Sequence, residues 1–165
     1  MTTPKLPALD PASVAELRGS GYPEPFRSRM GDRMKKKLGD ACGLSQFGVN
    51  LVTLGPGAQS ALRHWHTHED EFIYVLAGEV TLVTDAGEQV LRAGQCAGYP
   101  AGAQDAHHFV NRSKAPAQYL EVGSRIAEDI AHYPDDDLAW RKAEARSADG
   151  YRSTLIAAHK DGKPY

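Results

Sequence analysis

The segment HWHTHEDE, residues 64–71, gathers side chains that bind metal ions. Alternate side chains of a β-strand lie on one face, so His64 and His66 are expected to project together while Trp65 projects from the opposite face. Two imidazoles at this spacing can bind one ion, and Glu71 adds a carboxylate at the start of the next apolar run. This segment therefore predicts most of a metal site.

A further ligand must come from a distant part of the chain, and the segment HHFVN, residues 107–111, offers one. His107 would share a strand face with Asn111, whereas His108 would face the other way. A set of imidazoles with one carboxylate suits Fe(II), Mn(II), Ni(II), Co(II), Cu(II) or Zn(II). Four protein ligands leave up to two positions of an octahedral ion for water or substrate, which is typical of a reactive site.

The elements that must position these residues are short β-type runs between residues 46 and 124. Glycine and proline pairs separate the runs, and no βαβ alternation is present, so the pattern favours an all-β sandwich or barrel over a parallel doubly wound sheet. The predicted strands cover residues 46–54, 71–76, 79–84, 88–91, 95–99, 107–111 and 118–122.

Two flanking segments accompany this predicted barrel. Residues 1–45 are rich in Pro and Gly and read as an arm, with one short helix over residues 11–18 that Asp10 would cap. The basic run in this arm, from Arg33 to Lys37, is interpreted as a solvated face or a partner-facing strand end. Residues 125–165 are expected to pack on the barrel as an extension, with a helix over residues 138–146 and a strand over residues 151–158.

Composition excludes several classes of function. The chain has 165 residues, enough for one domain, and a formal net charge of −2, so nucleic acid is not an expected partner. The N-terminus lacks the pattern of a signal peptide, and no apolar run approaches the roughly 18 residues of a membrane helix. Two cysteines, Cys42 and Cys96, do not make a disulfide framework, and a cytoplasmic, reducing location is expected.

Two stretches of this sequence resemble the two motifs of the cupin superfamily. The first runs from Gly57 through His64-x-His66-x4-Glu71 to Gly78, and the second is Gly94-x5-Pro100-x-Gly102 followed by His107-x3-Asn111. The resemblance covers about residues 46–124 and implies a double-stranded β-helix, or jelly-roll, barrel. It also implies one divalent transition metal ion, held at the positions that match the family's ligands: His64, His66, Glu71 and His107.

The spacing departs from the family pattern at two places. Six residues rather than five separate Gly57 from His64, and four rather than two separate Gly102 from His107. The longer second loop leaves His108 open as an alternative to His107. His68 is the competing ligand in the first motif, because it shares a strand face with His66 if the strand runs straight.

The neighbouring sequence resembles a group of bacterial single-domain conserved-barrel cupins, which implies a fold and a metal more firmly than a reaction. The leading hypothesis is a metal-dependent enzyme acting on a small molecule, of the dioxygenase or the isomerase/lyase type. A non-enzymatic sensor or small-ligand carrier is one alternative. A sugar epimerase or isomerase is another, and its phosphate would need basic pocket residues, for which Arg63, Arg92 and Arg125 are candidates. Exposed strand edges favour a homodimer.

Overall fold

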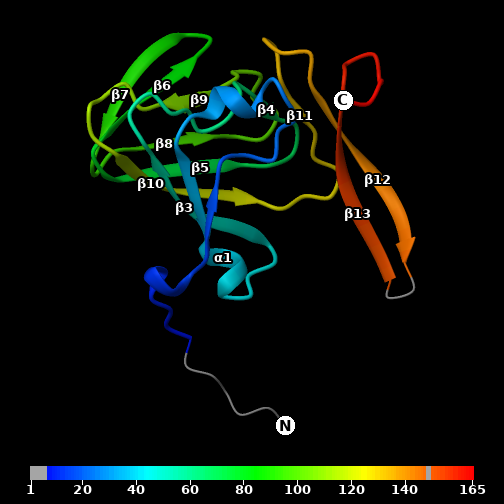
Figure 1. Ribbon diagram of the computed structural model, residues 1–165, viewed down its shortest axis with the longest axis horizontal. Coiled ribbons are helices and arrows are strands. Elements are labelled where there is room, and N and C mark those ends of the chain that lie inside the picture. The colour runs from blue at the N-terminus through cyan, green and yellow to red at the C-terminus, as the bar shows by residue number, and fades with distance from the viewer. Residues whose placement is uncertain (1–6, 148–149) are drawn as a thin grey trace.

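The computed structural model describes the backbone of residues 7–147 and 150–165, and the side chains of residues 7–140 and 156–165. Its paired strands are antiparallel and form three sheets, in the orders β1-β2-β3-β10-β5-β8, β13-β12-β11-β4 and β7-β6-β9 (Figure 1). The chain is therefore all-β, with the expected jelly-roll barrel. The barrel strands are β3 (Phe47–Leu54), β5 (Glu71–Ala77), β6 (Glu79–Thr84), β7 (Gly87–Arg92), β8 (Cys96–Tyr99), β9 (His108–Val110) and β10 (Ala117–Ser124).

The barrel core follows from the two-residue period of its strands. Val52 and Leu54 of β3, Tyr119 of β10, and Ile73 and Val75 of β5 are buried, while the residues between them face outward. Because one face of this sheet is apolar and buried, a register shift of one residue would expose the whole set, so burial fixes the register. The same core includes Ala58, Val80, Leu82, Leu91, Phe109 and Ala117.

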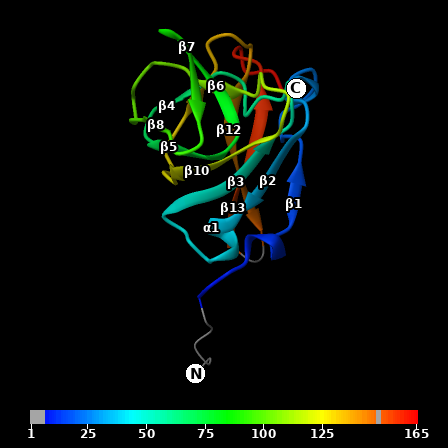
Figure 2. The ribbon, with the colours of Figure 1, turned by 90° about the vertical axis from the view of Figure 1, so that its left-hand side faces the viewer.

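The N-terminal segment extends the main barrel sheet. Strand β2 (Arg33–Lys37) pairs with β3, and β1 (Glu16–Arg18) pairs with β2, as the side view shows (Figure 2). The predicted helix over residues 11–18 is wrong beyond its first turn, because only the 3₁₀ helix η1 (Pro11–Ser13) forms. Asp10 caps it, as expected, by accepting a hydrogen bond from the Ala12 N–H. A helix this short is marginal without tertiary contacts, so pairing with β2 decides the conformation of the remaining residues.

Two short helical segments complete the N-terminal region. They are η2 (Arg27–Met30), before β2, and α1 (Leu38–Ala41), directly after it. Among the described residues, no helix is long and apolar enough to span a membrane.

The C-terminal segment forms a long hairpin that stands beside the barrel (Figure 1). Strand β12 (Ala139–Ser147) pairs along its whole length with β13 (Gly150–Ala158). The predicted strand over residues 151–158 is confirmed, but the predicted helix over residues 138–146 is wrong. Cross-strand pairing is a nonlocal interaction, and it overrides the weak local helix preference of that stretch. The short strands β11 (Ala131–His132) and β4 (Trp65–His66) connect this hairpin to the barrel.

A second apolar cluster joins the arm and the extension to the barrel. Phe26 and Met30 come from the N-terminal segment, Leu62 from the barrel, and Tyr133 and Leu138 from the C-terminal segment. Met30, Leu62 and Leu138 are almost fully buried. Residues from all three predicted segments therefore meet in one core, although the division at residues 45/46 and 124/125 itself stays a prediction.

Two turn residues hold the barrel strands in register. Asn111 is fully buried, and its amide donates to the carbonyl oxygens of Leu54 and Ala115 while its own oxygen accepts from Ser113. Gly78 has φ +71° between β5 and β6, as expected for a turn glycine. A Cβ added at Gly78 would lie 2.9 Å from the Pro116 carbonyl oxygen, so both conformation and space require glycine there.

The substitution Gly78→Ala should lower the free energy of unfolding by about 2–4 kcal/mol, because it adds a steric clash to the cost of positive φ. The control is Gly94→Ala, since Gly94 also has positive φ but has no heavy atom within 4 Å of its added Cβ. We expect the control to lose about 1–2 kcal/mol in urea unfolding. Equal losses in the two variants would show that the close approach to Pro116 is not a constraint.

Candidate metal centre

Backbone pairing brings the two predicted ligand segments together inside the barrel. The N–H of His64 donates to the His107 carbonyl oxygen, and the N–H of His107 donates to that of His64, so these distant residues lie side by side. His66 lies in β4, and Glu71 begins β5 opposite Tyr99 of β8. Pairing between segments far apart in the sequence therefore places the side chains, and no single local motif suffices.

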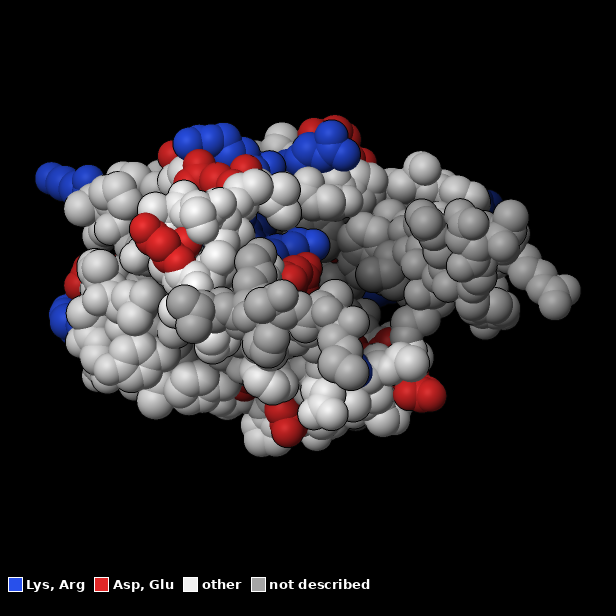
Figure 3. All heavy atoms as spheres, turned by 90° about the horizontal axis from the view of Figure 1, so that it is seen from below, with Lys and Arg blue, Asp and Glu red and all other residues white. Residues whose placement is uncertain are grey.

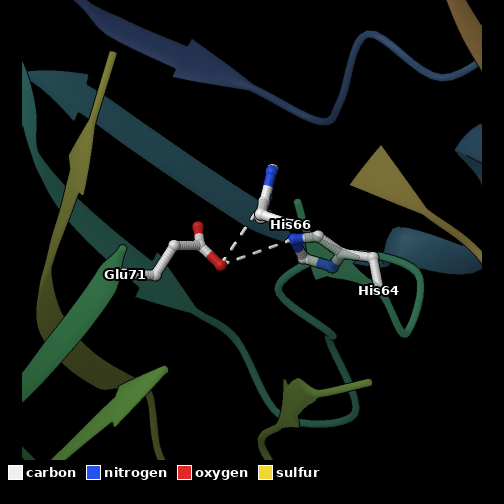
Figure 4. A group of neighbouring side chains, drawn as sticks. All are labelled: His64, His66 and Glu71. Atoms are coloured by element: carbon white, nitrogen blue, oxygen red, sulfur yellow. Dashed lines mark ion pairs between the residues drawn. The ribbon is translucent and has the colours of Figure 1, made fainter. Parts of the chain in front are cut away.

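The imidazoles of three histidines converge on one oxygen atom of Glu71. Its Oε2 lies 3.7 Å from His64 Nε2, 3.7 Å from His66 Nε2 and 3.1 Å from His107 Nε2. Figure 4 shows the Glu71 carboxylate pointing from β5 toward His64 and His66. The ligand atoms of these three residues all lie within 4.8 Å of one another, and His107 lies beside this trio.

These distances lie within about 0.3 Å of the separation expected for two ligands of a shared tetrahedral cation. Two ligand atoms about 2.1 Å from one ion lie roughly 3.0 Å apart at right angles and roughly 3.4 Å apart at a tetrahedral angle. The Glu71 Oε2 atom is also buried, and it has no hydrogen-bond partner among the described residues. A buried carboxylate oxygen without a donor is costly, and a metal ion among the imidazoles would satisfy it. The donor set of imidazoles and one carboxylate suits a divalent transition metal.

Hydrogen bonds at the other ring nitrogen orient two of the imidazoles. His64 Nδ1 lies 2.8 Å from the Leu62 carbonyl oxygen, which can only accept, so Nδ1 carries the proton. His66 Nδ1 lies 2.6 Å from Asp129 Oδ2. In a neutral ring, either arrangement leaves Nε2 unprotonated and facing Glu71, which is the tautomer that binds metal.

Asp129 is a site residue that the sequence did not indicate. Besides its contact with His66, it accepts hydrogen bonds through Oδ1 from the backbone N–H groups of His68 and Glu69, which fix the loop before β5. His66, Glu69 and Asp129 form a second group of possible ligand atoms. Glu69 Oε1, however, accepts from the Ile126 N–H, so these carboxylates already have donors within the protein. We therefore interpret this group as the support of His66.

His107 is held by stacking. Its ring lies parallel to that of Tyr99, with centroids 3.4 Å apart and an interplanar angle of 4°. The side chain of His107 is almost fully buried, and its Nδ1 has no hydrogen-bond partner among the described residues. The stacked tyrosine therefore fixes the plane of the ring, while Nε2 points to Glu71.

The protonation states of the site suit a cation. Burial disfavours the charged form of His64 and lowers its pKa to about 4, although the Glu71 carboxylate opposes this. Burial acts to raise the pKa of Glu71, but His107 and the other two histidines outweigh it and lower that pKa to about 2. At neutral pH, His64 is therefore neutral and Glu71 ionised, as coordination requires.

The two competing histidines lie outside this convergence. His68 is exposed, and its Nδ1 contacts the Thr67 hydroxyl at 2.7 Å. His108 Nδ1 lies 3.1 Å from the Ala61 carbonyl oxygen. Both rings thus have partners away from the Glu71 carboxylate, which favours His66 and His107 as the site residues.

A cavity of about 480 Å³ opens on three of the four metal-centre residues. The barrel contributes His64, Glu71, His107 and Glu121 to its lining. Flanking segments also line it, with Gly19, Tyr22, Arg33, Lys35 and Lys37 from the N-terminal arm and Tyr133 and Trp140 from the C-terminal extension. The arm and the extension are therefore parts of the site.

The predicted basic pocket residues are wrong. Arg63 pairs with Asp85 and Asp135, Arg92 pairs with Glu79, and Arg125 pairs with Asp40. None of the three arginines is among the described residues that line the cavity.

Three of the four lining cations come instead from β2, whose basic run was interpreted as a solvated face or a partner-facing strand end, and the fourth is Arg18 of β1. The missed signal was the alternation Arg33, Lys35, Lys37, which puts three cations on one strand face.

Comparisons with known proteins agree with this architecture. Residues 50–123 match the family model for the cupin domain, and no curated protein matches the chain. The structure of a sugar phosphate isomerase from a cupin superfamily, from Silicibacter pomeroyi, is 45% identical with a TM-score of 0.84, over 96% of each chain.

Two further solved structures are more distant. A protein from Acidithiobacillus ferrooxidans, described provisionally as a sugar phosphate isomerase, is 28% identical with a TM-score of 0.66, over 79% of this chain and 78% of that one. A polyketide cyclase from Streptomyces resistomycificus shares the fold, at 24% identity and a TM-score of 0.57, over 73% of this chain and 80% of that one. The barrel, the paired histidine segments and the 45% identity along nearly the whole of both chains show that this protein belongs to the cupin superfamily.

Proposed function

We propose that the protein is a metal-dependent isomerase that acts on a phosphorylated sugar. The observation that carries the proposal is one cavity lined both by three of the four metal-centre residues, His64, Glu71 and His107, and by cations of β2. The similarity to the Silicibacter pomeroyi sugar phosphate isomerase supports the same reaction class. Charged side chains in the cavity beside the ligand set favour an enzyme, because apolar side chains would close the pocket of a carrier.

His64, His66, Glu71 and His107 would hold one divalent transition metal ion. When bound, the ion would supply Lewis-acid polarisation of a substrate oxygen. His66 depends on Asp129 for its orientation, and His107 depends on Tyr99. These supports keep the imidazoles directed at Glu71 before any substrate enters.

Glu121 is the candidate for moving a proton. It lines the cavity from β10, and both of its hydrogen bonds, from Lys35 Nζ at 2.8 Å and Asn50 Nδ2 at 2.9 Å, reach Oε1. The other oxygen, Oε2, keeps its lone pairs for a substrate proton. Burial would raise the pKa of Glu121, but the Lys35 ammonium outweighs burial and lowers it, so the carboxylate is ionised at neutral pH and able to accept.

A homodimer is part of the proposal. Phe72, Tyr74 and Leu76 project from the outer face of β5 and are 42%, 39% and 42% exposed. An apolar sheet face is self-complementary when two copies meet about a twofold axis.

The variant Tyr74→Arg should convert this dimer to a monomer, because pairing would bury a charge in the apolar face. Light scattering coupled to size-exclusion chromatography would measure the masses of both proteins. A wild type that stays monomeric at micromolar concentrations would contradict the dimer, and so would an unchanged dimer in the variant.

The variant His66→Ala should lose most of its bound metal while the barrel still folds, because it removes a ligand and no core side chain. The matched control is His68→Ala, which removes an exposed histidine two residues away and should keep the wild-type metal content. Elemental analysis of tag-free protein, with circular dichroism as the test of folding, measures both. Full metal content in His66→Ala would show that the ligand assignment is wrong.

The reaction itself can be tested with a panel of aldose and ketose phosphates in D₂O. We expect interconversion of one pair, and deuterium incorporation next to its carbonyl group, both followed by NMR. The variant Glu121→Gln should lower kcat by about 100-fold or more, the range for loss of a general base. The proposal fails if metal-loaded protein neither interconverts nor exchanges any member of the panel. Binding without turnover would favour the carrier hypothesis.

A further inference from the structure

We infer that the inward face of β2 is a phosphate-binding subsite, in which Arg33 and Lys35 bind the phosphomonoester group of the substrate. The inference rests on the proposed function, because it names the part of the cavity that would hold the phosphate. It adds a site distinct from the metal centre and located on a segment outside the residues matched by the cupin family model.

The register of the main sheet aims the basic side chains of β2 into the barrel. Arg33 is opposite Leu54 of β3, and Lys35 is opposite Val52. Residues directly opposite each other in an antiparallel pair project from the same face, and both β3 residues are fully buried in the core. Arg33 and Lys35 therefore lie on the interior face of the sheet, whereas Lys36 lies on the other face and donates to the Pro11 carbonyl oxygen.

Arg33 is the strongest indication of a missing anion. Its side chain lines the cavity, and the residue is only 9% exposed. Nη1 donates to the Gly19 carbonyl oxygen at 3.0 Å, but the buried Nε has no hydrogen-bond partner, and no ion pair among the described residues includes Arg33. A buried guanidinium without a carboxylate is costly, and its fork of donors matches the geometry of a phosphate.

The charge balance of the cavity also favours an anionic ligand. Its lining contains Arg18, Arg33, Lys35 and Lys37 against two carboxylates, those of Glu71 and Glu121. Arg18 pairs with acidic residues of the arm, so it need not be counted, and Lys35 pairs with Glu121. Lys37 pairs with Asp40, which leaves Arg33 and the Glu71 carboxylate, so a divalent cation bound at Glu71 would make the cavity net positive.

The size of the cavity allows one molecule to reach both places. The same cavity is lined by His64, Glu71 and His107 and by Arg33 and Lys35, and its volume is about 480 Å³. Pockets for small molecules commonly measure about 300–1,000 Å³. Figure 3 shows Lys and Arg atoms with an acidic side chain beside them in a recess of the face seen from below. A sugar phosphate bound there would place its phosphate on β2 and a sugar oxygen toward the histidines.

The experiment is isothermal titration calorimetry with inorganic phosphate, on protein as purified and on the same protein after chelation. The wild type should bind phosphate in both states, because β2 lies apart from the metal-centre residues. Arg33→Met and Lys35→Met should each weaken binding at least tenfold. The matched control, Lys36→Met, removes the same charge from the opposite face of the same strand and should stay within twofold of the wild type. Circular dichroism checks the fold of each variant. If Arg33→Met does not fold, the affinity of Lys35→Met for phosphate is the test of the inference.

A second arm compares fructose 6-phosphate with fructose. We expect the phosphorylated sugar to bind and its binding to need Arg33 and Lys35, with no binding of fructose to the chelated protein. The inference is overturned if the wild type binds neither phosphate nor sugar phosphate, if only free phosphate binds, or if Lys36→Met weakens binding as much as the inward variants do. If phosphate binding weakens in Arg33→Met and Lys35→Met but the wild type isomerises no sugar phosphate, that result would support the subsite and count against the proposed reaction.

Discussion

Burial of the Glu71 carboxylate among three imidazoles is the constraint on which the rest of the site depends. An ionised carboxylate leaves water only if positive charge or donors replace the water. Here Oε2 has three Nε2 atoms within 3.7 Å but no hydrogen-bond donor. The reciprocal backbone hydrogen bonds between His64 and His107 make this arrangement possible, because they join the two segments that supply the rings.

The segments outside the barrel contribute residues to the site and to its cavity. The arm adds β1 and β2 to the main sheet and brings Arg33 and Lys35 to the cavity, while the extension brings Asp129 to His66 and Tyr133 to the cavity wall. The second apolar cluster fixes both segments to the barrel. The barrel thus carries the candidate metal chemistry, and the flanking segments form the part of the pocket that would select a ligand.

Local patterns in the sequence were sufficient to predict the barrel strands, and the resemblance to the cupin motifs predicted that the histidine segments converge. The alternation around Ile73 and Val75, and the turn at Gly78, are local signals that survive in the folded chain. The flanks were predicted less well, because β1 and β12 form through pairing with strands that local preference does not reveal. Asp129 follows no motif, since it reaches His66 across 63 residues of sequence. The role of Arg33 was hidden for the same reason, because only its pairing opposite Leu54 shows that it faces inward.

X-ray absorption spectroscopy of tag-free protein, combined with anomalous diffraction from its crystals, tests the central claim most directly. We expect about one divalent transition metal ion per chain, with imidazole nitrogens and a carboxylate oxygen at about 2.0–2.2 Å. The anomalous peak should lie between His64, His66, Glu71 and His107. An ion bound only at exposed residues such as His68, or a fully loaded protein whose metal has no carboxylate or imidazole ligands, would contradict the account.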